Sequence, residues 1–316
     1  MLDEEEGEWN ENYSNDLLDI GIGRLPIRTP RDQPRSLAQA TLVVNKLIRY
    51  DEPISFGKWR NRITFVADDG NGAIFITEAC EPQAASITAD HPEFNVHKVY
   101  LDLYPQIIAS GGQRSPECNR AIDESIEQGS LITHYSGHGG PSGWADEQIL
   151  TKQSVLALQN RNRLTFMVTG TCDFSTYDNP EEDSAGELAL TNVEGGAIGL
   201  LTTTRLAFAD QAVSITSPLY NTIFKPNNGQ MPRLGEITQF SKNNGNRSTT
   251  TRNFILLGDP TTRLAAAQQE AVIDSVNGKL VTAAALDTLK ALSKIKLSGP
   301  LEMVRQLTVN FPGKHT

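Results

Sequence analysis

Two similar stretches decide the fold of this chain. Residues 131–140 are LITHYSGHGG, and residues 164–174 are LTFMVTGTCDF. Each begins with a run of apolar, β-branched or aromatic residues and breaks at a glycine just before a residue that can do chemistry, His138 in one and Cys172 in the other. A run of this kind closed by glycine predicts a buried strand of a parallel sheet.

The pattern of the two stretches predicts that these two side chains meet. In an open parallel sheet, sites are built at the edge formed by the carboxyl ends of the strands. We therefore expect Cys172 to be a nucleophile and His138 its base, because a nearby imidazole stabilises the reactive thiolate. The backbone amides of Gly139 and Cys172 would then form an oxyanion hole. His134, the competing base, is expected to be a packed core histidine.

Strand-like and helix-like segments alternate along the rest of the chain. Strands are predicted at 17–26, 63–67, 96–103, 195–205 and 254–258, and helices at 32–50, 73–89, 115–128, 146–160, 183–190, 212–225 and 232–243. This order is typical of an α/β fold with a mostly parallel sheet and crossover helices.

The ends of the chain differ from the middle. Residues 1–16 are acidic and rich in asparagine, which predicts a mobile N-terminal segment. Residues 17–265 carry the α/β pattern. From residue 266 onward, short strands are expected at 272–280, 292–297 and 301–311, separated by Asn-Gly (277–278), Ser-Gly-Pro and Pro-Gly turns, with some helical character between 282 and 294. This stretch is too short to complete an immunoglobulin-like sandwich, so it would be the opening part of one.

Composition narrows the possible functions. The 316 residues carry a net charge of −10 and form no basic stripe, which argues against a nucleic-acid partner. The three cysteines show neither a disulfide framework nor metal-ligand spacing, so no metal site is assigned to them. No run of about 18 apolar residues is present, and the acidic N-terminus is unlike a secretory signal.

The blocks around His138 and Cys172 resemble those of the gingipain family of caspase-like cysteine peptidases. The resemblance rests on YSGHGGPSGWA at 135–145, on TGTCDF at 169–174, and on the shorter elements GRLP at 23–26 and GDP at 258–260. It implies a caspase-like sheet flanked by helices, the start of a β-sandwich after it, and cysteine endopeptidase activity that requires no cofactor.

The strings HGGPSGWA (138–145) and CDFSTYDNP (172–180) are closer to one branch of this family, the signal peptidase and sortase of the type IX secretion system. That branch implies cargo proteins with a C-terminal secretion signal, other secretion components as partners, and possible transfer of cargo to anionic lipopolysaccharide. It also implies a location on the outer cell surface and a longer full-length protein with a signal peptide. The alternatives are a secreted general protease and a catalytically silent binding module.

The resemblance also assigns roles to less distinctive residues. Glu93 falls where gingipains place a carboxylate that contacts the catalytic histidine, although the segment is ordinary and a solvated surface residue is the favoured interpretation. Trp144 is expected either to form a pocket wall or to lie in the core. Thr203, Thr204 and Arg205 would bind substrate, with an ion pair as the alternative for Arg205.

The residues around Tyr104 bear on substrate specificity, and the loop at 68–72 bears on metal binding. Arginine-specific gingipains carry an acidic residue where this chain has Tyr104, so specificity for arginine is not expected unless the nearby Asp102 takes that place. The acidic loop at 68–72 (DDGNG) could bind calcium through oxygen ligands or could be a solvated loop.

Overall fold

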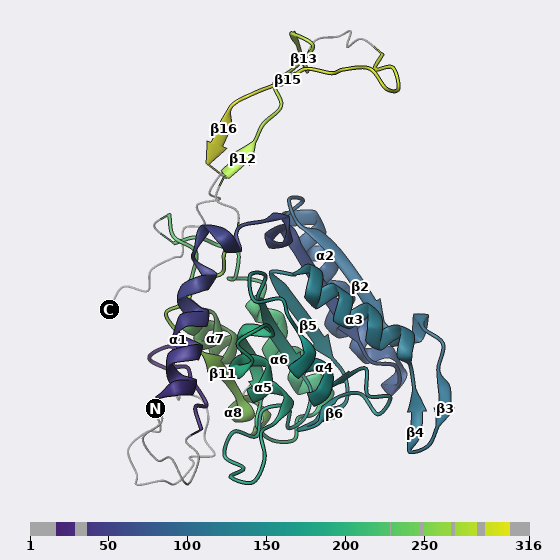
Figure 1. Cartoon of the computed structure of the whole chain (residues 1–316), viewed down its shortest axis with the longest axis vertical. Helices are drawn as coiled ribbons and strands as arrows, with labels where there is room; N and C mark the ends of the chain where they lie inside the picture. The colour runs from purple at the N-terminus through teal and green to yellow at the C-terminus, as the bar shows by residue number, and fades with distance from the viewer. Residues whose placement is uncertain are drawn as a thin grey trace. The chain divides into compact units, whose positions relative to one another are not determined.

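A six-stranded sheet forms the centre of the first part of the chain (Figure 1). Its strand order is β11-β10-β9-β5-β1-β2, and every neighbouring pair is parallel except β10 with β11. The strands are β1 (Arg62–Ala67), β2 (Asn95–Tyr100), β5 (Ile132–Ser136), β9 (Thr165–Gly170), β10 (Ala197–Thr203) and β11 (Phe254–Gly258). The predicted mostly parallel α/β class is therefore confirmed.

The computed structural model describes residues 17–28, 37–227, 229–246, 249–266, 269–282 and 288–303. The chain divides into two compact units, Met1–Ala265 and Ala266–Thr316. The expected N-terminal segment 1–16 lies outside the described residues, as do residues 32–36 of the first predicted helix.

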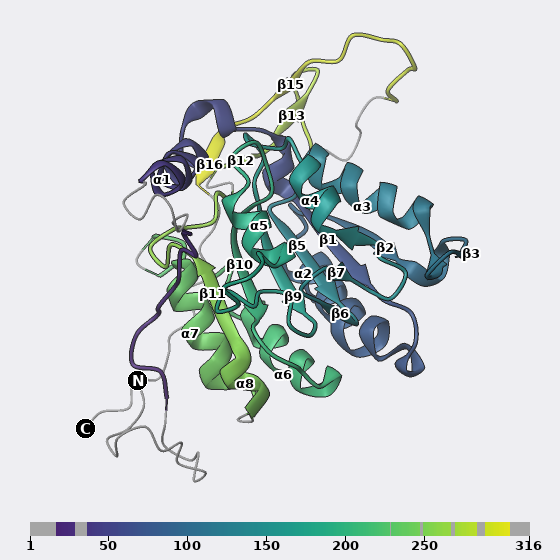
Figure 2. The ribbon, with the colours of Figure 1, turned by 60° about the horizontal axis from the view of Figure 1, so that its bottom comes forward.

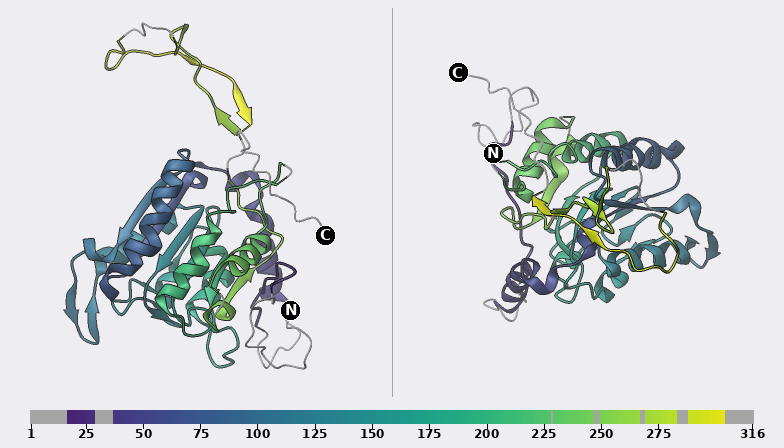
Figure 3. Two further views of the ribbon diagram at one scale, coloured as in Figure 1. Left: turned by 180° about the vertical axis from the view of Figure 1, so that it is seen from behind. Right: turned by 90° about the horizontal axis from the view of Figure 1, so that it is seen from above.

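Helices cover both faces of the sheet in the first unit (Figures 1, 2 and 3). One face carries α1 (Ala38–Tyr50), α3 (Pro116–Gln128), α4 (Lys152–Ala157) and α5 (Ala185–Thr191). The other face carries the π-helix η4 (Phe75–Cys80), α2 (Glu81–Asp90), α6 (Ala209–Leu219) and α7 (Leu234–Asn244). The short helix α8 (Thr249–Asn253) leads directly into β11. All residues of β5, β9 and β10 are buried between these layers.

Small elements complete the first unit. A two-stranded sheet outside the main one is the hairpin of β3 (Ile107–Ala109) and β4 (Gly112–Arg114). A three-stranded sheet consists of β6 (Gly139–Gly140), β7 (Gly143–Trp144) and β8 (Leu150–Thr151). The 3₁₀ turns are η1 (Pro53–Ser55), η2 (Lys58–Asn61), η3 (Asn71–Ala73) and η5 (Leu101–Leu103).

Local sequence signals explain where several helices begin and end. The Ser184 hydroxyl and the Glu187 carboxylate form the capping box that their spacing predicts at the start of α5. Helix α3 starts at Pro116 and stops at Gly129, whose φ of 90° is readily adopted only by glycine.

Three predicted elements differ from the observed ones. Residues 17–26 form a single bridge from Arg24 to Leu257 instead of a strand. The predicted helix 146–160 is reduced to α4, because residues 150–151 pair with β7 and hold that part of the chain extended. The predicted strand 96–103 ends at Tyr100 and continues as the 3₁₀ turn η5.

The second unit consists of short antiparallel pairs. Strand β12 (Gln269–Ala271) pairs with β16 (Leu301–Met303), and β13 (Ser275–Val276) pairs with β14 (Lys279–Leu280) and β15 (Leu297–Ser298). The predicted Asn277-Gly278 turn joins β13 to β14 with both φ angles positive. Residues 288–294 are not helical, and residues 283–287 and 304–311 lie outside the described part. The β-sandwich stays a prediction.

Among the helices that the structure describes, none is both long enough and apolar enough to cross a bilayer.

A buried cation stabilises the end of helix α5. The Lys46 side chain is only 4% exposed, and its Nζ atom lies within hydrogen-bond distance of four backbone carbonyls that share its three N–H donors. The acceptors are Ala189 (3.2 Å), Leu190 (2.9 Å), Asn192 (2.8 Å) and Gly195 (2.7 Å). Ala189 and Leu190 lie in the last turn of α5, where carbonyls have no donor within the helix, and Asn192 and Gly195 belong to the cap and the loop that follow, so Lys46 joins the open end of α5 to this loop.

We expect Lys46→Met to destabilise the fold by about 2 to 4 kcal/mol, because four buried carbonyls lose one charged donor. Thermal unfolding followed by circular dichroism measures the change. Lys58→Met, at an exposed lysine, is the matched control and should leave the unfolding temperature unchanged. Equal unfolding temperatures for both variants would contradict this role of Lys46.

Candidate active site

The register of β5 and β9 brings His138 and Cys172 to the same edge of the sheet. The two parallel strands pair from Ile132 with Phe166 through Ser136 with Gly170. Beyond this last pair the Gly137 amide still donates to the Gly170 carbonyl at 3.2 Å. His138 and Cys172 each follow their strand's last paired residue by two positions. The predicted pair therefore lies on neighbouring loops at the carboxyl edge.

Glycine at position 139 lets these two loops touch. A methyl group on Gly139 would lie 2.6 Å from the Thr171 hydroxyl oxygen and 2.8 Å from the Gly143 carbonyl oxygen. Both distances are shorter than a carbon side chain tolerates. Any larger residue at 139 would push the histidine loop away from the cysteine loop.

Cys172 is the accessible cysteine of this chain. Its side chain is partly exposed, whereas Cys80 and Cys118 are fully buried. The Cys172 Sγ atom lies 3.3 Å from the Ala207 carbonyl oxygen and 3.4 Å from the Ala207 amide nitrogen. The thiol is thus positioned by the backbone that follows β10.

His138 presents its ring at the surface. The ring is exposed and meets the edge of the Phe75 ring with centroids 5.4 Å apart. Within the described residues its nitrogens make no hydrogen bond, and in particular none with the Cys172 thiol. The imidazole is free to contact a substrate atom, and catalytic hydrogen bonds commonly form only once substrate is bound.

The backbone of His138 is held much more tightly than its ring. The Asp68 carboxylate, 2% exposed, accepts the His138 amide at 2.7 Å and the Asp69 amide at 3.0 Å. The His138 carbonyl accepts the Tyr135 hydroxyl at 2.5 Å and the Ala145 amide at 2.9 Å. Three of these hydrogen bonds fix the loop from which the imidazole projects, and the fourth, from the Asp69 amide, orients the Asp68 carboxylate.

The structure does not bring Glu93 to His138, contrary to the prediction from the resemblance. Glu93 precedes β2, at the amino edge of the parallel sheet, while His138 lies at the carboxyl edge. Its partner is His91, at 3.3 Å. The carboxylate that contacts His138 is Asp68, which sequence reasoning assigned only to an acidic loop. Its position just after a strand, like that of His138 and Cys172, is the signal that could have identified it.

The two amides expected to form an oxyanion hole are both available. The Ala145 amide bonds to the His138 carbonyl, and hydrogen-bonded pairs alternate along an antiparallel ladder. Gly139 therefore faces Trp144 in a non-hydrogen-bonded pair, and its amide points away from that ladder. The Cys172 amide donates no hydrogen bond to any residue that the structure describes.

Trp144 belongs to the core and is not a pocket wall. It is fully buried and stacks on the Tyr135 ring with centroids 4.4 Å apart and planes within 7°. His134 is likewise a core residue, as predicted: it is fully buried with Nδ1 2.8 Å from the Tyr220 hydroxyl.

The residues at the end of β10 support the cysteine loop from behind. The buried Thr203 hydroxyl donates to the Thr171 carbonyl at 2.5 Å, and the Thr204 hydroxyl donates to the Asn253 carbonyl at 3.2 Å. Arg205 forms an ion pair with Asp178, which is the alternative that the sequence left open. The contacts of these residues are within the protein and replace the expected role in substrate binding: Thr203 supports the cysteine loop, Thr204 binds the segment before β11, and Arg205 pairs with Asp178.

The sequence pattern was assigned no function at residues 206–208, which directly follow Arg205. Leu206 and Phe208 are 73% and 68% exposed, and they flank Ala207, whose backbone contacts the Cys172 sulfur. Their position just beyond the end of a strand, on the same edge as Cys172, was the available signal. Two exposed apolar side chains beside the thiol offer an apolar surface to a ligand.

Three acidic groups cluster beside the histidine loop. Single carboxylate oxygens of Asp68, Asp69 and Glu147 lie within 4.8 Å of one another. Each could supply one oxygen to a hard cation such as Ca²⁺. Both Asp68 oxygens already accept backbone amides, which satisfies that carboxylate without an ion. The predicted solvated loop is wrong for Asp68, which is buried.

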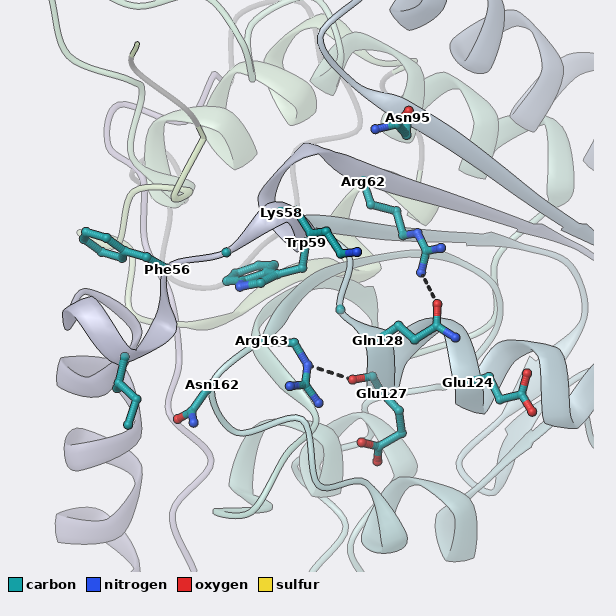
Figure 4. A pocket seen from close by; sticks show the side chains of 13 residues that line it. Phe56, Lys58, Trp59, Arg62, Asn95, Glu124, Glu127, Gln128, Asn162 and Arg163 are labelled. Carbon is teal, nitrogen blue, oxygen red and sulfur yellow. Dashed lines mark hydrogen bonds between the residues drawn. The ribbon is translucent and has the colours of Figure 1, made fainter. Parts of the chain in front are cut away.

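A separate pocket opens at the amino edge of the sheet (Figure 4). Its lining includes Phe56 and Lys58, the start of β1 at Arg62, the start of β2 at Asn95, and Arg163 just before β9. Because the strands are parallel, this pocket and the Cys172 site lie at opposite edges.

Comparison with known proteins places this arrangement in a family. Residues 1–265 match the model of peptidase family C25. The chain belongs to peptidase family C25. This is the family of gingipain-type cysteine peptidases, so the first unit of this C25 protein is a cysteine peptidase domain. No curated protein sequence matches the chain.

Solved structures show the same fold. The crystal structure of the Arg-specific cysteine proteinase gingipain R (RgpB) has a TM-score of 0.59 at 14% identity, covering 78% of this chain and 60% of that one. The complex of Porphyromonas gingivalis RgpB pro- and mature domains has a TM-score of 0.59 at 14% identity, covering 86% and 69%. The C25 chain thus spans less than two thirds of the first of these structures.

Burial raises the pKa of the Asp68 carboxyl to about 7, against the opposing effect of the His138 amide. Between about pH 4 and 7 the folded state therefore holds a proton that the unfolded state has lost, and stability falls as pH rises. At about 1.4 kcal/mol per pKa unit, the fall is at most about 4 kcal/mol.

We expect Asp68→Asn to remove this pH dependence. Urea unfolding of both proteins from about pH 5 to 8 measures it: the variant should gain stability relative to the parent as pH rises. Asp102→Asn, at an exposed carboxylate, is the control. Parallel stability profiles of the parent and Asp68→Asn would show that Asp68 does not hold its proton in the folded state.

Proposed function

We propose that this C25 domain is a PorU-like endopeptidase of the type IX secretion system, which removes the C-terminal signal domain of secreted cargo. The single observation that supports the peptidase chemistry is the placement of His138 and Cys172 on adjacent loops of two paired strands. The assignment to the PorU branch is supported by the strings at 138–145 and 172–180.

In the first chemical step, the Cys172 thiolate attacks the scissile carbonyl carbon and a carbon–sulfur bond forms. The carbonyl oxygen becomes negatively charged and is stabilised by the amides of Gly139 and Cys172. The C–N bond then breaks, and the leaving amine takes a proton from His138. The products are the released signal domain and a thioester on Cys172.

In the second step, a nucleophile attacks the thioester and the carbon–sulfur bond breaks. Water gives hydrolysis. An amine of anionic lipopolysaccharide gives transfer, which makes the enzyme a sortase at the outer cell surface. His138 accepts the proton of either nucleophile, so the same two side chains serve both outcomes.

The surface beside the thiol favours an uncharged residue before the scissile bond. Leu206 and Phe208 are apolar and exposed there, and Asp178, a nearby carboxylate, is already paired with Arg205. Tyr104 is half-buried against the core, and burial raises the pKa of its hydroxyl, so it offers no negative charge. Neither Tyr104 nor the paired Asp178 would therefore supply the negative charge that an arginine side chain requires.

A peptide electrophile such as an acyloxymethyl ketone should modify Cys172 alone, because Cys80 and Cys118 are buried. His138→Ala should slow the labelling by about 100-fold or more, since general-base catalysis contributes that much. Intact-mass and peptide mass spectrometry measure the site and rate. His97→Ala, at a histidine on β2, is the control and should label at the parental rate.

Equal modification of all three cysteines, or the same labelling rate in the parent and in His138→Ala, would contradict the peptidase and favour a catalytically silent binding module.

The secretion role is tested in cells whose chromosomal copy carries Cys172→Ala. Cargo proteins should then keep their C-terminal signal domain, because no thioester can form. Immunoblotting of cargo with an antibody against the signal domain measures retention. Normal cargo processing alongside lost labelling of purified protein would instead support a secreted general protease.

A further inference from the structure

A hairpin projects from the edge of the sheet that carries Cys172. Strands β3 and β4 follow the carboxyl end of β2, the same edge at which β5 and β9 deliver His138 and Cys172. Its turn contains Ser110 and Gly111, whose φ of 95° suits glycine. The hairpin extends away from the body of the first unit in every view (Figures 1, 2 and 3).

The hairpin exposes apolar side chains that the core does not use. Ile108 is 92% exposed, Ile107 is 52% exposed, and Leu103, in the turn that leads to the hairpin, is 73% exposed. A group of apolar residues at the surface of a projecting element is typical of an interaction site. Within the described residues the hairpin forms a sheet of only these two strands, so its outer edges are open to a further strand.

The base of the hairpin is tied to the segments that hold His138. The Gln106 side chain donates to the Asp69 carboxylate at 2.5 Å, and Asp69 adjoins Asp68, which binds the His138 amide. The Arg114 guanidinium donates to the Asp146 carbonyl at 3.2 Å, next to Ala145 on the other side of the histidine loop. The hairpin therefore has a fixed position beside the catalytic edge.

Charge on the hairpin argues against a membrane as its partner. Between residues 101 and 115 the charged residues are Asp102 and Arg114 alone. Binding to anionic lipid needs a cluster of lysines or arginines, which this segment lacks. The edge is shared with the cysteine and histidine loops, and the ligand of a peptidase at that edge is an extended polypeptide.

We propose that the β3–β4 hairpin, with Leu103, is an exosite that binds an extended apolar segment of the protein substrate outside the residues around the scissile bond. This inference rests on the proposed peptidase function and specifies what kind of substrate it takes. Proteins that present such a segment bind more tightly than short peptides, because they bury Ile107 and Ile108 as well as occupying the site at Cys172.

The test compares a protein and a peptide substrate in the double variant Ile107→Ser, Ile108→Ser of the full chain. The protein is a cargo protein with its signal domain, and the peptide contains about eight residues around the same cleavage site. We expect kcat/KM to fall about 10-fold or more for the protein, mainly through KM, because the variant loses the apolar surface that the substrate segment would bury; tenfold corresponds to about 1.4 kcal/mol. For the peptide, kcat/KM should not change.

Two exposed apolar residues elsewhere provide matched controls. Leu156→Ser on α4 and Phe56→Ser at the amino-edge pocket replace side chains that are 57% and 60% exposed. Both should cleave protein and peptide at the parental rates. Unfolding temperatures of all variants report whether any of them has lost structure.

A binding measurement separates failure of the exosite from failure of the peptidase. In a Cys172→Ala background, the double serine change should raise the Kd for intact cargo by about 10-fold or more, whether or not the parent cleaves it. An unchanged Kd, or equal loss on protein and peptide, would overturn the exosite. Dissociation of a dimer into monomers by the serine variant, without a change in Kd, would instead identify a self-association surface.

Discussion

The register between β5 and β9 is the constraint on which the rest of this protein depends. Because the strands are parallel, and Ser136 lies opposite Gly170, their carboxyl ends finish at the same level. The Gly137 amide extends the pairing by one hydrogen bond, so the loops separate only at His138 and Cys172. A shift of one residue would reverse which face each strand residue meets and would displace both side chains at once.

Hydrogen bonds to the backbone of His138, and not a contact between the His138 and Cys172 side chains, give the site its shape. Asp68, Tyr135 and Ala145 hold the His138 peptide groups, while Ala207 contacts the Cys172 sulfur through its own backbone. Two of these contacts come from side chains, the Asp68 carboxylate and the Tyr135 hydroxyl, so the position of the histidine loop depends on the identity of these two residues. Burial of the Asp68 carboxyl lowers the stability of the fold, since burial disfavours the charged form of this group.

The parallel direction of the strands gives the sheet of the first unit two different edges. The carboxyl edge carries Cys172, His138, the apolar pair Leu206 and Phe208, and the projecting hairpin. The amino edge carries the polar pocket lined by Arg62 and Arg163 (Figure 4). In a fold of this type, the direction of the strands decides which loops can cooperate in one site.

The sequence by itself determined the strands around 131–136 and 164–170, the placement of His138 and Cys172 just after them, the capping box of α5 and the Asn277-Gly278 turn. These features are local, because apolar runs, glycines and capping residues act on their immediate neighbours. The tertiary structure alone decided that Trp144 is buried, that Glu93 lies at the wrong edge, and that Asp68 holds the histidine loop. Each of these depends on which distant strand lies beside which, and such long-range pairing is set by the packing of the whole sheet.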